Sequence, residues 1–319
     1  MCGALSYDSG APPATIDSVF DLASLTKVIS TGTIIARLVA RGALQLDTPV
    51  SAWVPGWRAL DRASVTLRQL LDHSSGLPAH VDLFKQCRDA AAFEAAISEV
   101  ALAYQPGSQA LYSDLGFILL GFIIERAGGR SLHEQFADVA AQLEPFMDFL
   151  PPARLRDAIA PTEQDPWRGR VLQGEVHDEN AHALGGVAGH AGLFGTVEAV
   201  GSFARAVLAS LRMPNWIGTP ELMRSFVSPS LVPGSSRALA WDTMRPTSSC
   251  GTLMSPTAVG HTGFTGTSLW IDWERDVYVV LLTNRVHPTR ENATLVALRP
   301  QFHDAVMRAF GPERKTKKS

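Results

Sequence analysis

The sequence has few cysteines, almost no imbalance of charge and no extended basic region before its last residues. Its 319 residues include three cysteines, an odd number with no Cys-x-x-Cys spacing, which argues against a disulfide framework. A net charge of −3 gives no electrostatic reason to expect binding to nucleic acid or to an anionic membrane. Only the run from Arg314 to Ser319 is strongly basic, and we expect it to be a solvated end of the chain.

Long apolar runs are also scarce. No stretch approaches the roughly eighteen consecutive apolar residues of a membrane helix, so we expect no transmembrane segment. Residues 1–10 have neither a basic region nor the apolar core of a signal peptide. The sequence as given therefore predicts a cytoplasmic location. Its 46% hydrophobic content is enough for one large core or for two sub-domains that share a cleft.

Ser24 and Lys27 form a Ser-x-x-Lys motif at the expected start of a helix. Side chains three residues apart share one helical face, which places the hydroxyl beside the amine. A serine is a weak nucleophile near neutral pH and needs a neighbouring base, which a lysine with a pKa lowered by burial can supply. The motif predicts covalent acyl transfer, although by itself it also fits an ordinary helix start with a solvated lysine.

A second motif, Tyr112-Ser113-Asp114, precedes an apolar run over 117–124. This placement predicts a loop at the mouth of a buried helix. There Tyr112 can take up the proton of Ser24, and Asp114 can orient Lys27 or a substrate amide. The alternative is a simple helix cap, with Ser113 or Asp114 bonded to the first turn.

A third motif, His261-Thr262-Gly263, lies where apolar alternation predicts two adjacent strands. Glycine at 263 and 266 leaves room for a ligand to approach the strand backbone. A backbone N–H here, such as that of Phe264, can polarise a carbonyl. The alternative is a strand rich in glycine and threonine with a histidine on the surface.

Together the three motifs resemble those of the serine β-lactamase and penicillin-binding-protein superfamily, and most closely its class C-like esterase, peptidase and amidase branch. The run over 70–78 resembles the helix-then-turn signature of that branch, and the likeness covers roughly residues 18–310. It implies an α/β (α+β) fold, in which an antiparallel sheet flanked by helices stands beside an all-helical sub-domain. The active site would lie in the cleft between them.

The resemblance also implies roles for the motif residues: Ser24 as the nucleophile, Lys27 and Tyr112 as proton acceptors, Asp114 and His261 as supporting groups, Thr262 and Gly263 as substrate contacts, and the backbone N–H groups of Ser24 and Phe264 as the oxyanion hole. It implies no cofactor. The expected function is hydrolysis of an amide or ester through an acyl-enzyme.

Three departures from the pattern matter. His261 stands where lysine is usual, and a largely neutral histidine holds a carboxylate less firmly, which makes penicillin hydrolysis a weaker expectation. Asp114 stands where asparagine is frequent; its charge tends to keep Lys27 protonated and favours Tyr112 as the base. Only 23 residues precede Ser24, fewer than in similar proteins, so an earlier natural start and an exported form stay open.

Residues 159–163, 167–170, 174–181 and 185–194 are similar to a subgroup linked with turnover of cell-wall muropeptides. This similarity implies a peptidoglycan fragment or a small ester as the substrate, with His177 and Asn180 among its contacts. The same stretch holds a cluster of potential metal ligands: His177, Asp178, Glu179, His182 and His190. The spacing does not align two histidines on one helical face and no cysteine accompanies them, so no metal site is predicted.

Three alternative functions stay open at this stage. They are a β-lactamase or D-Ala-D-Ala carboxypeptidase, a non-catalytic sensor on the same fold, and a metallohydrolase that uses the cluster between His177 and His190. The sequence does not indicate an oligomeric state.

Apolar periodicity predicts helices over 25–41, 66–73, 89–103, 115–127, 131–143, 196–211, 219–226 and 291–309, and strands near 4–7, 18–21, 257–262, 267–272 and 277–283. Because the strand signals lie at both ends of the chain, we expect one sheet assembled from the two termini. The expected sub-domains are residues 1–45 with 230–319, forming the α/β part, and residues 46–229, forming the mainly helical part.

Overall fold

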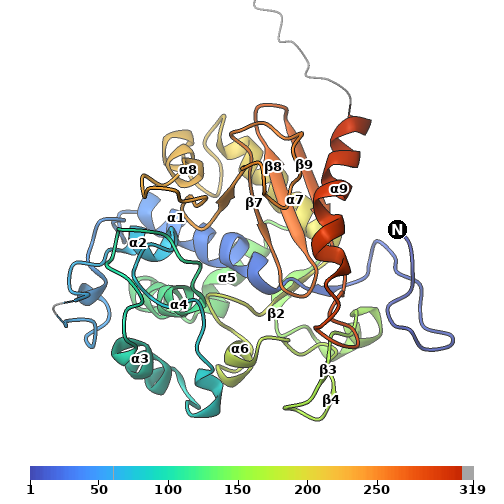
Figure 1. The fold of residues 1–319 in the computed structure, drawn as a ribbon, viewed down its shortest axis with the longest axis horizontal. Coiled ribbons are helices and arrows are strands. Elements are labelled where there is room, and N and C mark those ends of the chain that lie inside the picture. The colour runs from blue at the N-terminus through green and yellow to red at the C-terminus, as the bar shows by residue number, and fades with distance from the viewer. Residues whose placement is uncertain (60, 311–319) are drawn as a thin grey trace, which may run out of the picture.

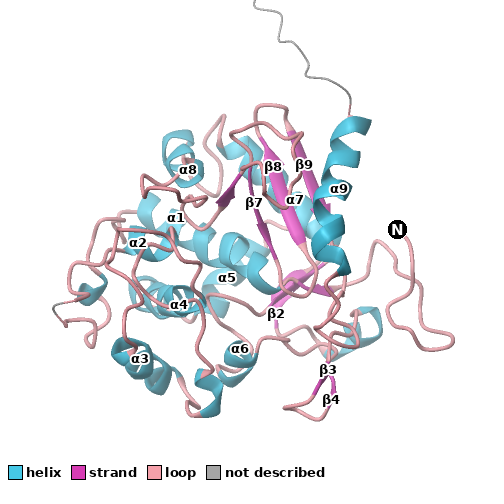
Figure 2. Cartoon of the chain, viewed as in Figure 1, coloured by secondary structure: helices cyan, strands magenta, loops and turns pink. Residues whose placement is uncertain are grey.

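A computed structural model describes residues 1–59 and 61–310 (Figure 1); the basic tail predicted to be solvated lies outside them. The main sheet is antiparallel, in the order β6 (Asp242–Thr243), β7 (Val259–Thr262), β8 (Ser268–Asp272) and β9 (Val277–Leu281). The last three strands confirm the predictions near 257–262, 267–272 and 277–283. The mixture of helices and an antiparallel sheet, drawn in Figure 2, confirms the predicted fold class.

Strand β8 is buried along its whole length because helices cover both faces of the sheet. Leu269 and Ile271 point into the main core, on the side of α7 (Val197–Ser210). Trp270 points the other way and packs with Met307 of α9 (Thr294–Ala309). Alternate side chains of a strand face opposite sides, so a strand covered on both faces is apolar at successive positions.

The helical region is centred on α4 (Asp114–Gly128), nine residues of which are buried. A helix that is apolar all round belongs in a core, and α2 (Leu67–Leu71), α3 (Ala90–Glu99) and α5 (Leu132–Ala140) pack against it. It ends at Gly129, whose φ of +66° forms a left-handed cap. Two further helices are short: α6 (Glu179–Ala183) and α8 (Pro220–Val227).

The predicted helix over 25–41 is present but irregular. A 3₁₀ turn (Ala23–Leu25) leads into a π-helical segment (Lys27–Gly32), which continues as α1 (Thr33–Ala40). π-Helical turns are rare and occur frequently at functional sites. The predicted helix over 89–103 ends earlier, at Glu99.

The prediction that both termini build one sheet is wrong for the described residues. The stretch near 4–7 forms no strand; Leu5 N–H donates to the carbonyl of Pro12, and Ala4 makes only an isolated bridge with Pro13. The predicted strand at 18–21 is β1 (Phe20–Asp21), which pairs with β5 (Leu193–Gly195) beside β2 (Met147–Phe149). A separate hairpin joins β3 (Gln164–Asp165) and β4 (Arg170–Val171).

The proposed boundaries between the two sub-domains, at residues 45 and 229, stay a prediction. Helix α7 falls within the part expected to be helical, yet it packs against β8 and β9. Strand β5, from the same part, pairs with β1.

Among the described residues, one helical segment, Ala23–Ala40, is long and apolar enough by length and composition to cross a membrane. The segment is not a continuous apolar run, since it includes Lys27 and Arg37. Within the fold 78% of the segment is buried, and it carries Ser24 and Lys27. Its apolar residues therefore have partners in the protein core.

Candidate active site

Ser24 lies in the 3₁₀ turn that directly precedes the π-helical segment. The residue before it, Ala23, has a φ of +47°, a left-handed conformation that is uncommon for residues other than glycine and that persists only where the surroundings enforce it. Asp21 Oδ1 accepts the N–H of Ala23 at 2.8 Å, and Thr26 Oγ1 donates to its carbonyl at 2.6 Å. Both backbone groups of Ala23 are thus held, which fixes the position of Ser24.

Asp21 is a site residue that the sequence analysis missed. It is buried, and its second carboxylate oxygen accepts the N–H of His177 at 2.7 Å. Burial raises the pKa of Asp21 and outweighs the opposing hydrogen bonds from His177 and Ala23. The sequence feature that could have revealed Asp21 is its position inside an otherwise apolar run, three residues before Ser24.

Lys27 is fully buried and contacts three acceptors. Its Nζ donates to Ser24 Oγ at 3.0 Å and to the carbonyl of His190 at 2.9 Å, and it forms an ion pair with Asp114 Oδ1 at 2.7 Å. An ammonium group has three donors, so the environment fits the charged form. Burial acts to lower the pKa of Lys27, but Asp114 and Tyr112 together outweigh it and raise the pKa. The expectation that burial lowers the pKa of Lys27 is therefore wrong. The prediction that Asp114 keeps Lys27 protonated is confirmed.

Tyr112 reaches the same cluster from the loop before α4. Lys27 Nζ lies 4.9 Å from the centre of its ring, and interactions with Lys27 and Ser24 act to lower the pKa of its hydroxyl. Burial raises the pKa of the phenol and outweighs the opposing effect of Lys27. The phenol therefore carries its proton in the resting state. The structure brings Ser24, Lys27 and Tyr112 together from two distant parts of the chain.

Asp114 is the first residue of α4, where the helix dipole favours a negative charge. Burial acts to raise its pKa, but Lys27 and His80 outweigh it and hold the pKa below its usual range. His80 Nδ1 lies 3.5 Å from Asp114 Oδ2, and this contact raises the pKa of His80 to about 9 despite partial burial. Sequence reasoning missed His80, which follows the signature at 70–78 by two residues. Ser113 makes no side-chain cap, because its hydroxyl donates to the carbonyl of Pro78.

His261 is buried on β7, and its ring centre lies 5.8 Å from that of Tyr112. The Nδ1 is 2.8 Å from the carbonyl of Thr262, while the buried Nε2 has no hydrogen-bond partner among the described residues. Burial, followed by the charges of Lys27 and Arg237, lowers the pKa of His261 to about 3. The imidazole is therefore neutral, as expected, and Nε2 presents a hydrogen-bond acceptor.

Gly263 allows β7 to approach the turn that carries Ser24. A Cβ at this position would lie 2.0 Å from Thr267 Oγ1 and 2.6 Å from the carbonyl of Leu22. We expect Gly263→Ala to lower the free energy of unfolding by about 1–3 kcal/mol, the usual effect of an overpacked site, and to reduce turnover. Thermal unfolding followed by circular dichroism measures the first effect.

Gly116→Ala is the matched control for Gly263→Ala. Gly116 lies in α4, where a Cβ would meet Leu70 atoms at 3.5 Å or more, and alanine is favoured over glycine in a helix by roughly 0.5–1 kcal/mol. An equal fall in melting temperature for both variants would show that the contact with Leu22 is not what makes Gly263 necessary.

The site opens into a cavity of about 740 Å³. Its lining includes eight of the ten predicted site residues: Ser24, Tyr112, Asp114, His177, His261, Thr262, Gly263 and Phe264. Asn180 does not line it. Its amide is buried and is bound at both ends to backbone, with Nδ2 donating to Val81 and Oδ1 accepting from Phe84. The structure therefore gives Asn180 a place in loop packing and does not bring it to the substrate space.

Phe264 lines the cavity and is 49% exposed. Its backbone N–H makes no hydrogen bond to any other described residue. The ring stacks on His177 with centres 5.6 Å apart, and Arg285 lies over it at 4.7 Å. The N–H has no acceptor among the described residues and both residues line the same cavity; its role in an oxyanion hole stays a prediction.

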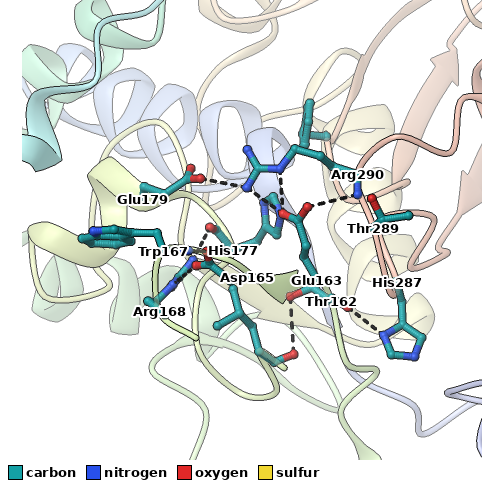
Figure 3. A network of polar contacts seen from close by, with 12 residues as sticks. Thr162, Glu163, Asp165, Trp167, Arg168, His177, Glu179, His287, Thr289 and Arg290 are labelled. Carbon is teal, nitrogen blue, oxygen red and sulfur yellow. Dashed lines mark hydrogen bonds and ion pairs between the residues drawn. The ribbon is translucent and has the colours of Figure 1, made fainter. Parts of the chain in front are cut away.

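The histidines of the 177–190 cluster contact different carboxylates. His177 Nε2 is 2.9 Å from Glu163 Oε2, and His190 Nε2 is 2.8 Å from Asp178 Oδ1; Figure 3 draws His177 beside Glu163. His182 Nδ1 approaches Glu175 only to 3.8 Å. Within residues 1–59 and 61–310, no three of these side chains converge in a way that could hold a metal ion. The metallohydrolase alternative therefore lacks a ligand set in this region.

A Ser-x-x-Lys pair whose lysine is buried against a tyrosine, in a cavity bordered by an antiparallel strand, defines a serine hydrolase. The sequence model of the Beta-lactamase family matches residues 2–301, and the chain belongs to this family. A protein of Escherichia coli (strain K12) named "Putative D-alanyl-D-alanine carboxypeptidase" is 30% identical to it over 86% of this chain and 70% of that protein. The N-acetylmuramyl-L-alanine amidase of Bacillus subtilis (strain 168) is 30% identical over 85% and 68%.

Solved structures show the same fold. A penicillin-binding protein homologue from Caulobacter crescentus has a TM-score of 0.71 at 21% identity, covering 89% of this chain and 82% of its own. A class C beta lactamase from Rhodobacter sphaeroides has a TM-score of 0.72 at 19% identity, covering 96% and 90%.

Proposed function

We propose that this protein hydrolyses an amide or ester bond of a peptidoglycan fragment through an acyl-enzyme at Ser24. The observation that carries the proposal is the contact of Lys27 Nζ with Ser24 Oγ at 3.0 Å, with the Tyr112 ring packed against Lys27. The names of the amidase and carboxypeptidase relatives support a cell-wall substrate.

In acylation, Ser24 Oγ attacks the substrate carbonyl carbon while its proton passes to the Tyr112 oxygen in the phenolate form. The Lys27 ammonium stabilises that phenolate and orients Oγ. Tyr112 then gives the proton to the leaving amine or alcohol as the carbonyl bond to it breaks. The N–H groups of Ser24 and Phe264 hold the oxyanion, an interaction whose loss typically costs roughly 3 kcal/mol.

The remaining motif residues support this step. Asp114 holds Lys27 in its charged form. Thr262 and Gly263 form the edge along which an extended substrate can lie, since β6 pairs only with residues 259 and 260 of β7. His261, being neutral, offers a hydrogen-bond acceptor to a substrate N–H or O–H.

The cavity also holds a cation, Arg299, that has no ion-pair partner among residues 1–59 and 61–310 and suits an anionic substrate. Arg299 on α9 is only 6% exposed and lines the cavity, and its Nε has no hydrogen-bond partner among the described residues. Burial and the nearby Arg285 lower its pKa. A buried charge without a partner is unfavourable by several kcal/mol. A carboxylate on the substrate would relieve this, which favours a muropeptide over a neutral ester.

A turnover panel of muramyl dipeptide, a D-Ala-D-Ala peptide, p-nitrophenyl butyrate and nitrocefin tests the proposal. We expect muramyl dipeptide to have the highest kcat/KM, the ester to be cleaved measurably and nitrocefin to be turned over negligibly. Release of D-alanine as the main reaction would favour the carboxypeptidase function, which the name of the Escherichia coli relative suggests. Fast nitrocefin hydrolysis would contradict the inference that a neutral His261 disfavours β-lactam hydrolysis.

Arg299→Gln tests the anionic part of the substrate. Hydrogen bonds to charged groups contribute about 1.5–3 kcal/mol, so we expect KM for muramyl dipeptide to rise about tenfold or more. The neutral ester should be much less affected. An equal change for both substrates would contradict recognition of a carboxylate by Arg299.

A further inference from the structure

The loop that carries Tyr112 is held on both sides of this residue by His73. Residues 111–113 belong to no helix or strand, so contacts with other parts of the chain determine where Tyr112 lies. The N–H of Leu111 donates to the carbonyl of His73 at 2.9 Å. The N–H of Ser113 donates to Nδ1 of the same histidine at 3.0 Å. His73 therefore binds the residue before Tyr112 and the residue after it.

The ring of His73 also contacts the ring of Tyr112. The two ring centres are 4.7 Å apart, and the ring of Phe117 in α4 lies 5.1 Å from that of His73. His73 is buried, which leaves its ring little room to move. Lys27 Nζ lies 4.9 Å from the centre of the Tyr112 ring. A displacement of His73 would therefore change the position of Tyr112 relative to Lys27.

The hydrogen bond to Ser113 defines the protonation of His73. A backbone N–H can only donate, so Nδ1 is the acceptor and carries no hydrogen. Burial lowers the pKa of His73 well below its ordinary value, and the charges of Arg237 and Lys27 act in the same direction. The ring is therefore neutral, with its hydrogen on Nε2. This is the form that the contact with Ser113 requires.

The backbone of His73 has a left-handed conformation, with a φ of +61°. This conformation is unfavourable for residues other than glycine and persists only where the surrounding structure enforces it. Glycine would suit the backbone at this position, but it would offer neither an acceptor for the N–H of Ser113 nor a ring to contact Tyr112. The contribution of this position to the site is therefore its side chain.

We propose that His73 is a positioning residue that holds Tyr112 in place for proton transfer with Ser24. This inference rests on the proposed acyl transfer, in which Tyr112 takes the proton of Ser24 Oγ. Such a transfer requires the two oxygens to come within roughly 2.6–3.2 Å of each other. His73 does not line the cavity, so it acts through the loop at 111–113 and not through contact with substrate.

Two variants of nearly the same shape, His73→Leu and His73→Asn, test the side-chain acceptor. Asparagine tolerates the left-handed conformation, and its side-chain oxygen can accept the N–H of Ser113; leucine has no acceptor. With p-nitrophenyl butyrate we expect kcat of His73→Leu to fall about 10–100-fold, because a misplacement of about 1 Å can cost as much as 10²-fold. KM should change less than about threefold, since binding of the ester does not use His73.

His73→Asn should regain most of this loss and keep kcat within about tenfold of the original value. Equal losses of kcat in the two variants would contradict the role of the acceptor. Circular dichroism shows whether each variant is folded. If His73→Leu does not fold, His73→Gln takes its place in the comparison, because the extra methylene displaces the acceptor from the N–H of Ser113.

The same substitution in a Tyr112→Phe background shows whether His73 acts through Tyr112. Residues that act as a unit have non-additive effects. Once the phenol is absent, His73→Leu should lower the rate of fluorophosphonate labelling at Ser24 by less than about threefold. A fall of about 10–100-fold in both backgrounds would overturn the assignment, because it would show an effect that does not depend on the Tyr112 hydroxyl.

His303→Leu is the matched control for the loss of a buried histidine. His303 Nε2 lies 3.1 Å from Ser268 Oγ, and the residue is buried in α9 and does not line the cavity. This variant should lower the melting temperature and leave kcat within a few-fold of the original value. If kcat fell as far as in His73→Leu, destabilisation alone would explain both results and the positioning role would be rejected.

Unchanged kcat in a folded His73→Leu would also reject the inference while leaving the proposed function intact. Failure of a fluorophosphonate to label Ser24 in the unaltered protein would instead contradict the proposed function itself, and this inference with it.

Discussion

Ser24→Ala is expected to abolish hydrolysis, with kcat/KM lower by about 10⁴-fold or more, as for removal of the nucleophile in other serine hydrolases. No other described hydroxyl combines contact with Lys27 Nζ, a position in the cavity lining and a neighbouring tyrosine hydroxyl. Stopped-flow or steady-state assays with p-nitrophenyl butyrate measure the loss. Labelling by a fluorophosphonate should disappear in the variant.

Ser30→Ala is the matched control for Ser24→Ala. Ser30 lies in the π-helical segment that follows the turn of Ser24, is buried, and its Oγ has no hydrogen-bond partner among the described residues. Its loss should leave kcat/KM within a few-fold of the original value. A fluorophosphonate adduct on any residue other than Ser24 would reject the assignment of the nucleophile.

Tyr112→Phe is expected to lower kcat by about 10²–10⁴-fold, the usual contribution of a general acid and base. Phenylalanine keeps the ring contacts with His73 and Lys27, so the fold should be preserved while proton transfer is lost. Tyr104→Phe is the control, because the Tyr104 hydroxyl donates to the carbonyl of His73 and does not line the cavity. It should affect stability by about 1 kcal/mol and leave turnover nearly unchanged.

The pH dependence of acylation tests the same role of Tyr112. Burial raises the pKa of the phenol above its ordinary value of 10, and the base acts as phenolate. The rate of acylation should therefore rise about tenfold per pH unit from pH 7 and reach no plateau below pH 10. A plateau already at pH 7 would contradict Tyr112 as the base.

Asp114→Asn should move that pH profile to lower pH. The carboxylate of Asp114 raises the pKa of Tyr112 and also that of Lys27, so its removal lowers both and makes a base available nearer neutrality. Fluorophosphonate labelling rates measured between pH 6 and pH 11 report the midpoint. An upward shift would show that Asp114 does not act through these charges.

Sequence and structure agree best where function is encoded by local spacing. The interval between Ser24 and Lys27 puts the two side chains one helical turn apart, whatever surrounds them. The order of the three motifs predicted the class of enzyme, and continuous apolar runs predicted α4 and the strands β7 to β9. These features depend on a few neighbouring residues, so a periodic pattern is enough to reveal them.

The errors of the sequence analysis arose where a residue has partners far along the chain. Asn180 was predicted to contact substrate, but residues 81 and 84 use both ends of its amide. Asp21 and His80 were missed, because nothing local marks an aspartate that holds Ala23 or a histidine that faces Asp114. The stretch at 4–7 found its partner in residues 12 and 13 and not in the C-terminal sheet.

By itself the sequence determined which groups are present and which of them are one turn apart: a serine, a lysine and a tyrosine in the order of a serine hydrolase. Only the tertiary structure decided their protonation, because a pKa depends on burial and on charges that approach through space. Lys27 is held charged by Asp114, and Nε2 of His177 is paired with a glutamate fourteen residues earlier. Neither contact follows from helical or strand periodicity, since each is created by long-range packing.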